Sequence, residues 1–201
     1  MTNSVHILIL AAGTSSRMRG GDKLLELVDG QPLLRIMAKR ALATGCPVTI
    51  ALPVLPHARY DAVDGLNVEL LPIPDAENGM SISLRTSVEA LQHKADRLLL
   101  LLGDLPDITT QHLQNVIDAP DSAPDALIWR GATQDGAPGH PVLFDQVLFP
   151  EFSKITGDKG AQSVVAAAQP AVHLVPLTGS AARLDLDTPE DWKKWRADQI
   201  K

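Results

Sequence analysis

Short runs of aliphatic residues alternate with segments of helical periodicity along most of the chain. The runs at 5–11 and 97–104 are almost continuously apolar, which is typical of strands buried on both faces of a parallel sheet. The alternation predicts an α/β sandwich of three layers with a mostly parallel central sheet. Strands are predicted at 5–11, 48–53, 68–72, 97–104, 126–131, 140–144, 171–177 and 183–187. Helices are predicted from Gln31 to about Gly45, from about Ser81, and at about 111–117, 161–168 and 189–199.

The size and composition favour one domain covering residues 1–201, because 201 residues suit a single core. Residues from about 130 to 160 are less regular, and an insertion over one end of the sheet is expected there. With 45% hydrophobic residues and no apolar run approaching ~18 residues, no membrane span is expected. The N-terminus lacks the positive region of a secretory signal, so a cytoplasmic location is expected. A net charge of −6 argues against nucleic-acid binding.

The loop after the first apolar run combines small residues, hydroxyls and positive charges. Ligands of open α/β sheets bind beyond the carboxyl ends of the strands. Gly13 permits close backbone approach, so that successive N–H groups can face an anion. Arg17 and Lys23 can add charge-assisted hydrogen bonds to a polyphosphate. The spacing fits neither a Walker motif nor G-x-G-x-x-G, and a polar surface turn is the alternative.

A carboxylate, Asp104, follows the most hydrophobic run of the chain. At that position it is a candidate ligand of Mg²⁺, which prefers oxygen and shares its coordination shell with substrate phosphates. A turn former that bonds its own backbone is the alternative. Asp107 fits better as a helix-entry or solvent-exposed carboxylate.

A second acidic segment precedes the last predicted helix. In a strand at 183–187, Asp185 and Asp187 project from the same face and can point at one site. Thr188 fits an N-cap and Pro189 the first helical position. Capping does not explain the two aspartates, and which of them would bind a metal directly stays open.

Two further segments carry candidate binding residues. Gly79 fits a tight turn, while Ser81 and Ser83 can either cap the following helix or grip a ribose or base. Flexible glycines flank His140, which fits a structural or positional role better than that of a general base.

Six ordered motifs together resemble the MobA-like nucleotidyltransferase family of molybdenum-cofactor maturation, in particular its cytidylyltransferase branch. They are Leu10-Ala11-Ala12-Gly13-x-Ser15-x-Arg17-Met18 with Lys23, Gly79-Met80-x-x-Ser83-Leu84, Gly103-Asp104-x-Pro106, Gly139-His140-Pro141-Val142, Gly157-Asp158-x-Gly160-Ala161 and Asp185-x-Asp187-Thr188-Pro189-Glu190-Asp191. The resemblance spans nearly the whole chain, and the ordered set is far more specific than any one motif.

The resemblance implies a Rossmann-like fold of the nucleotide-diphospho-sugar transferase type and transfer of CMP from CTP to the terminal phosphate of molybdopterin, with Mg²⁺ as cofactor and release of pyrophosphate. It implies catalytic roles for Arg17, Lys23 and Asp104. It implies nucleotide binding by Leu10, Ala11, Ala12, Gly13, Ser15, Arg17, Lys23, Gly79, Ser81 and Ser83. It implies acceptor binding by Gly139, His140, Asp158 and Gly160, on the side covered by the insertion, and metal binding by Asp104, Asp185 and Asp187.

One position bears on the choice of base. Related guanylyltransferases commonly carry Gly where this chain has Ala12, which favours CTP. One departure from the family pattern is the segment 19–22, which lengthens the gap between Met18 and Lys23. Two alternatives stay open: a nucleotidyltransferase for a sugar or polyol phosphate, and a non-catalytic carrier of molybdopterin nucleotide. Small molecules are the expected partners, and transient docking onto a molybdenum-dependent oxidoreductase is compatible with the resemblance.

Overall fold

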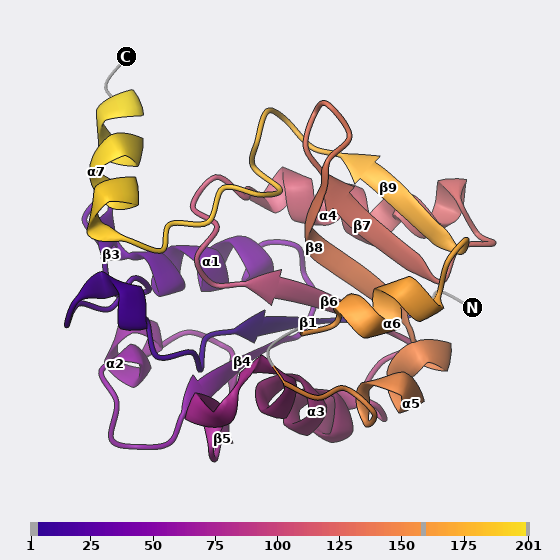
Figure 1. The fold of residues 1–201 in the computed structure, drawn as a ribbon, viewed down its shortest axis with the longest axis horizontal. Helices are drawn as coiled ribbons and strands as arrows, with labels where there is room; N and C mark the ends of the chain where they lie inside the picture. The colour runs from indigo at the N-terminus through magenta and orange to yellow at the C-terminus, as the bar shows by residue number, and fades with distance from the viewer. Residues whose placement is uncertain (1–3, 158–159, 200–201) are drawn as a thin grey trace.

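Seven strands form one central sheet in the computed structural model, which describes residues 4–157 and 160–199 (Figure 1). In spatial order they are β5 (Glu69–Ile73), β4 (Val48–Pro53), β1 (Val5–Leu10), β6 (Arg97–Leu102), β8 (Pro138–Asp145), β7 (Ile128–Ala132) and β9 (Val172–Pro176). Only β8 runs antiparallel to its neighbours in this sheet. The predicted α/β fold with a mostly parallel sheet is confirmed.

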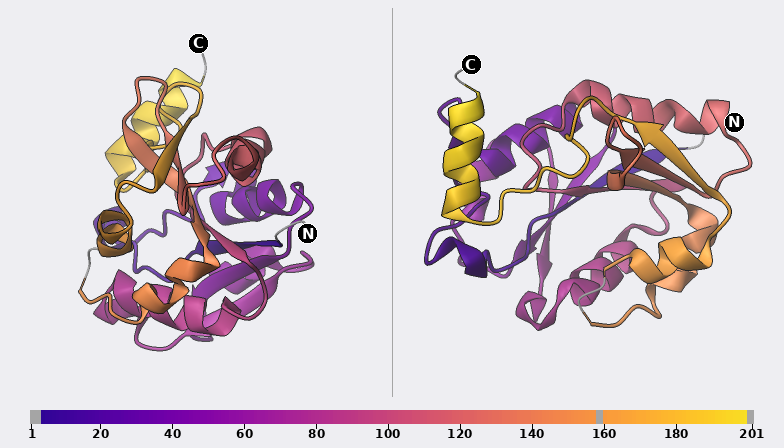
Figure 2. Two further views of the ribbon diagram at one scale, coloured as in Figure 1. Left: turned by 90° about the vertical axis from the view of Figure 1, so that its right-hand side faces the viewer. Right: turned by 45° about the horizontal axis from the view of Figure 1, so that its top comes forward.

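Helices cover both faces of the sheet, giving the three predicted layers (Figures 1 and 2). One face carries α1 (Leu33–Leu42) and α4 (Thr110–Ser122), and the other carries α3 (Met80–Leu91), α5 (Phe149–Phe152) and α6 (Gln162–Ala167). Two more helices, α2 (Arg59–Val63) and α7 (Pro189–Asp198), lie at the edge to which β1 and β6 point. Short elements complete the chain: η1 (Ser16–Met18), β2 (Leu27–Val28), β3 (Gln31–Pro32), η2 (Ala76–Asn78) and η3 (Gln146–Leu148).

Strand alternation divides the apolar residues between two cores. In β1, Ile7 and Ile9 pack with α1 and α4, whereas Leu8 packs with α3 and α5. The register pairs Leu10 with Leu102, so β1 and β6 end side by side. The loops that follow these two strands therefore meet at one edge of the sheet, where the sequence places Gly13 and Asp104.

The last helix begins as the sequence predicts. Thr188 is its N-cap, Pro189 its first residue, and the Thr188 hydroxyl accepts a hydrogen bond from the Asp191 backbone N–H. The first predicted helix is shifted, because Gln31–Pro32 pairs with Leu27–Val28 as a small hairpin and α1 starts at Leu33.

Two predictions differ from the structure. Residues 183–187 do not form a strand: Leu186 is buried, but the segment pairs with no strand of the sheet. The expected insertion at about 130–160 is not an excursion over one end, because β7 and β8 lie inside the central sheet and η3 and α5 follow β8 directly. No helix of the described residues is long and apolar enough to cross a membrane.

Candidate active site

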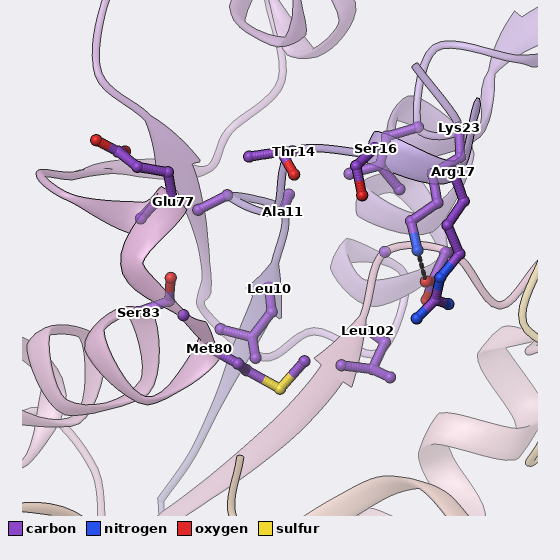
Figure 3. A pocket seen from close by; sticks show the side chains of 17 residues that line it. Leu10, Ala11, Thr14, Ser16, Arg17, Lys23, Glu77, Met80, Ser83 and Leu102 are labelled. Atoms are coloured by element: carbon purple, nitrogen blue, oxygen red, sulfur yellow. Dashed lines mark hydrogen bonds and ion pairs between the residues drawn. The ribbon is translucent and has the colours of Figure 1, made fainter. Parts of the chain in front are cut away.

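A cavity of about 530 Å³ lies beyond the carboxyl ends of β1 and β6. Figure 3 shows Arg17 and Lys23 at one end of it and Glu77, Met80 and Ser83 at the other. Its lining comes from three places: the loop after β1, the start of α3, and the residues after β6. They are Leu10, Ala11, Ala12, Gly13, Thr14, Ser16, Arg17, Lys23, Leu24, Ala76, Glu77, Gly79, Met80, Ser83, Leu102, Gly103 and Asp104.

A buried arginine of α2 holds the loop after β1 in place. The Arg59 side chain is 1% exposed and donates two hydrogen bonds to the carboxylate of Asp22, at 2.8 and 2.9 Å. It also donates to the Ala11 carbonyl at 2.6 Å and to the Ser15 hydroxyl at 3.0 Å. Ser15 itself has a left-handed backbone with φ 51°, which costs energy in a residue with a Cβ. Arg59 thus ties three points of the loop to a helix that follows another strand.

Arg59 and Asp22 are functional-site residues that the sequence analysis missed. Asp22 lies 11 residues beyond the predicted strand at 5–11 and Arg59 lies 6 residues beyond the one at 48–53, and no local pattern links two residues that are 37 positions apart. Asp22 belongs to the segment that departs from the family pattern, and its Oδ1 accepts the Leu24 backbone N–H at 3.0 Å. That bond fixes the backbone on both sides of Lys23, so the longer gap does not displace the lysine from the cavity.

The cations and carboxylates of the cavity form one network. Lys23 Nζ lies 2.5 Å from Asp104 Oδ2 and 2.6 Å from Asp187 Oδ1, and Arg17 also pairs with Asp187. The dashed line in Figure 3 marks the Lys23–Asp104 contact. Burial lowers the pKa of Lys23, but the two carboxylates more than offset this and raise it, so the ammonium stays charged.

One carboxylate oxygen is left over in this network. Asp104 Oδ1 is buried and has no hydrogen-bond partner. Among the described residues, no three His, Cys, Asp or Glu side chains lie close enough to hold a metal ion by themselves. Mg²⁺, however, usually binds through one or two carboxylates together with waters and substrate phosphates. The free oxygen of Asp104, next to space for a polyphosphate, therefore fits a magnesium ligand.

The two acidic residues before α7 are not equivalent. Asp187 turns into the network, whereas Asp185 is exposed and makes no hydrogen bond or ion pair with Lys23. Loss of solvation raises the pKa of Asp185, and the charges of Asp104 and Asp187 raise it further. The structure therefore brings Asp187 to Lys23 through an irregular segment and not through the strand alternation that the sequence suggested.

Most of the predicted nucleotide-binding residues line the cavity, with two exceptions. Ser15 instead bonds Asp22 and Arg59, and Ser81 is buried with 3% exposure in the packing of α3. The predicted capping role of Ser81 and Ser83 is wrong, because the N-cap of α3 is Gly79 and no side chain caps it. Ser83 remains in the cavity wall.

The predicted acceptor residues lie in different surroundings. His140 and Gly160 line a second cavity of about 200 Å³, which shares Met80 and Leu102 with the first. Gly139 packs against the backbone of Ala182 so closely that a Cβ would not fit. Close packing therefore explains why this residue is a glycine. Asp158 lies outside the described residues.

Comparison with known proteins agrees with this geometry. The family model for the MobA-like NTP transferase domain matches residues 7–172. The chain belongs to this family. As a MobA-like NTP transferase it is similar to a protein of Nostoc sp. named probable molybdenum cofactor guanylyltransferase, with 32% identity over 126 residues, which is 63% of this chain and 58% of that protein.

The chain is also similar to a longer bifunctional protein and to a solved structure. The bifunctional protein GlmU of Staphylococcus epidermidis is 30% identical over 119 residues, which is 58% of this chain. The match spans about a quarter (26%) of that protein's length. The crystal structure of Rv0371c from Mycobacterium tuberculosis superposes with a TM-score of 0.82 at 26% identity, covering 96% of this chain and 97% of that one. The fold is that of the nucleotide-diphospho-sugar transferases, shared by MobA-like NTP transferases.

Proposed function

We propose that the protein transfers CMP from CTP to the terminal phosphate of molybdopterin and releases pyrophosphate. The observation that carries this proposal is the cavity in which a glycine-rich loop, two fixed cations and an aspartate with a free oxygen converge. The family membership and the name of the Nostoc relative support a molybdenum-cofactor substrate.

The charged residues of the cavity have different roles in the transfer. Arg17 and Lys23 bind the triphosphate, and they can turn to it because it brings negative charges that replace those of Asp104 and Asp187. Asp104 would hold Mg²⁺ through its free oxygen, and Asp187 is a further carboxylate within reach of Lys23. When bound, Mg²⁺ neutralises charge on the phosphates in the transition state.

The reaction requires little proton transfer. An acceptor phosphate is already ionised at neutral pH, so one of its oxygens attacks the α-phosphorus, the bond to the bridging oxygen breaks, and pyrophosphate leaves with the electron pair. Positioning and charge neutralisation by the loop and by Lys23 therefore supply most of the rate enhancement.

The preference for CTP rests on Ala12. This residue is 4% exposed and lines the cavity between the loop and α3. A Cβ at this position narrows the space beside a base, which favours the smaller pyrimidine, while one methyl group is worth only ~1–3 kcal/mol of discrimination. Other residues of the cavity must contribute to any larger preference.

Pyrophosphate release from each of the four NTPs, with and without molybdopterin, tests the proposal. We expect release that depends on molybdopterin and Mg²⁺ and a kcat/KM higher for CTP than for GTP. Equal or preferred use of GTP would remove the cytidylyl assignment but keep nucleotidyl transfer. Pyrophosphate release with a sugar or polyol phosphate, and not with molybdopterin, would assign that compound as the acceptor. Tight binding of molybdopterin without any pyrophosphate release would favour the carrier function.

We infer one functional unit over residues 1–201 and transient docking onto a molybdenum-dependent oxidoreductase that receives the product. Co-purification of the two proteins in the presence of CTP and molybdopterin tests the docking.

A further inference from the structure

Three of the four carboxylate oxygens of Asp104 and Asp187 are paired with a cation of the chain itself. Lys23 Nζ lies 2.5 Å from Asp104 Oδ2 and 2.6 Å from Asp187 Oδ1 (Figure 3 shows the contact with Asp104). Arg17 pairs with Oδ2 of Asp187. Of the four oxygens, Asp104 Oδ1 alone lacks a hydrogen-bond partner among the described residues. As long as Lys23 stays in this position, the two carboxylates can offer a metal ion one oxygen.

The ammonium of Lys23 lies at the point that a cation shared by both carboxylates would occupy. Asp104 follows β6 and Asp187 precedes α7, so two segments that are far apart in the sequence converge on one nitrogen atom. A metal ion bound by both carboxylates would need the space that this ammonium now fills, and two cations at one point repel each other. Lys23 and a shared metal ion therefore exclude each other.

The charges of these four side chains cancel in the free protein. Lys23 and Arg17 supply two positive charges, and Asp104 and Asp187 supply two negative ones. The side chains of Lys23 and Asp104 are only 19% and 12% exposed, so water and dissolved salt screen their charges little. A divalent cation that approaches therefore meets a balanced cluster and not two free carboxylates.

A triphosphate can change this balance without any movement of the backbone. The cavity beside the cluster has room for a polyphosphate. Lysine has a flexible four-carbon stem, so the ammonium of Lys23 can turn to a phosphate while the bond from the Leu24 N–H to Asp22 keeps the backbone in place. A triphosphate carries enough negative charge to pair with both cations. It thereby leaves Asp104 and Asp187 with negative charge that a divalent cation can neutralise.

We propose that Lys23 is an internal cation that fills the dicarboxylate site of the free protein, and that the nucleotide exchanges it for the divalent metal ion. Nucleotide and metal then bind cooperatively, because the nucleotide draws Lys23 from the carboxylates and the metal leaves Lys23 free to bind phosphate. The free protein accordingly holds the metal weakly. The inference rests on the proposed function in taking a nucleoside triphosphate and a divalent metal as ligands of this cavity, but it does not depend on the base or the acceptor.

Mn²⁺ alone is the probe, because the electron paramagnetic resonance signal of unbound Mn²⁺ reports binding without nucleotide or turnover. We expect Lys23→Met to bind Mn²⁺ at least ~10-fold more tightly than wild type, since the change removes the competing charge and keeps an unbranched side chain. Combining Lys23→Met with Asp104→Asn should abolish this gain, because one of the two carboxylates is then lost. Unchanged or weaker Mn²⁺ binding by Lys23→Met would overturn the inference.

Arg17→Met is the matched control, because it removes one positive charge from the same cluster. Arg17 pairs with Oδ2 of Asp187, whereas Lys23 bridges the two carboxylates. Arg17→Met should therefore raise the affinity for Mn²⁺ clearly less than Lys23→Met does. Equal gains in the two variants would reveal a general effect of charge and would also overturn the inference.

The reverse competition gives a second measurement that leaves Lys23 unchanged. In EDTA, Asp104→Asn should bind CTP at least ~10-fold more tightly than wild type, because Lys23 is then held by one carboxylate fewer. The same variant should lose Mg²⁺-dependent turnover, and a residue that only supports the fold would not change the two in opposite directions. Equal or weaker CTP binding by Asp104→Asn in EDTA would contradict the exchange. Mn²⁺ and CTP binding that follow these expectations, together with no pyrophosphate release by wild type, would instead reject the proposed transfer alone.

Discussion

The two adjoining cavities differ in how the polar side chains that line them are paired. In the larger cavity, Lys23 lies between Asp104 and Asp187, so opposite charges compensate each other. In the smaller cavity, burial keeps His140 neutral, and its buried Nδ1 has no hydrogen-bond partner. The larger cavity is therefore lined by charges of both signs, whereas the lining of the smaller one carries the single charge of Arg130 and otherwise uncharged side chains.

The largest effect should come from the buried ion pair that supports the charged cavity. Arg59→Met leaves Asp22 Oδ2 and the Ala11 carbonyl without their donor, and breaking a buried pair costs about 3–5 kcal/mol. Urea unfolding should record this loss, and the KM for CTP should rise because the loop loses its support. Arg40→Met is the control, because Arg40 donates its hydrogen bonds to the carbonyls of Pro106 and Ile108 and none to a carboxylate. Equal losses in both variants with an unchanged KM would show that Arg59 serves stability alone.

The charge network itself is tested by Asp104→Asn. The variant keeps the shape of the side chain but removes the charge that faces Lys23 and the proposed magnesium ion. We expect a normal fold and a loss of Mg²⁺-dependent turnover of at least ~100-fold, the scale for removing a principal electrostatic stabiliser.

Asp107→Asn is the matched change outside the cavity, since Asp107 accepts a hydrogen bond from the Trp195 indole at 2.9 Å. This control should retain its turnover. Near-normal activity of Asp104→Asn would remove Asp104 from the site.

The buried neutral histidine of the smaller cavity should make the stability of the protein depend on pH. The pKa of His140 falls from 6.5 to about 4 on folding, so below pH 6.5 the unfolded chain takes up the proton first. Stability that is complete above pH 6.5 is therefore lost as the pH falls toward 4, by about 2 kcal/mol at pH 5. Unfolding free energies of wild type and His140→Leu, measured from pH 7 to pH 5, isolate this contribution, because His6 and His112 titrate in both proteins. Parallel curves would contradict the buried neutral imidazole.

The smallest expected effect concerns the wall beside the base. Ala12→Gly removes one methyl group from the charged cavity and leaves its ion pairs intact. The preference for CTP over GTP in kcat/KM should narrow by about 10-fold without inverting, in line with the ~1–3 kcal/mol of one methylene-sized difference. Competition between the two nucleotides for the same molybdopterin measures this ratio, and an unchanged ratio would place base selection elsewhere.

The sequence predicts the parts of the fold that depend on contiguous patterns. The apolar runs of β1 and β6 and the cap of α7 at Thr188 are local signals, and each is found in the structure. Apolar and polar residues alternate in the segment 183–187 as they do in a strand. A buried Leu186 is enough to account for this pattern, without any pairing in the sheet. Its backbone bonds the Asp104 carbonyl at 3.3 Å and meets no strand edge, a tertiary circumstance that the pattern cannot reveal.

The candidate site follows the same rule. The loop residues Gly13, Arg17 and Lys23 and the aspartate after β6 were predicted because they stand directly after strands, and they line one cavity. Arg59 was missed, because its partners Ala11, Ser15 and Asp22 lie 37 to 48 positions away along the chain. A charged residue within a short helix is ordinarily exposed, and only the folded packing turns Arg59 inward.

The contact between Arg59 and the loop after β1 also limits how this chain can be engineered or can diverge. The conformation of the loop depends on residues 11–22 and also on Arg59 of α2, some 40 positions away. The loop sequence alone therefore does not specify this conformation. A graft of the loop onto another sheet would need an arginine at the corresponding place on a neighbouring helix. Conversely, a substitution of Asp22 within this protein leaves Arg59 buried without its carboxylate and therefore requires a second substitution at Arg59. The two positions are thus expected to change together.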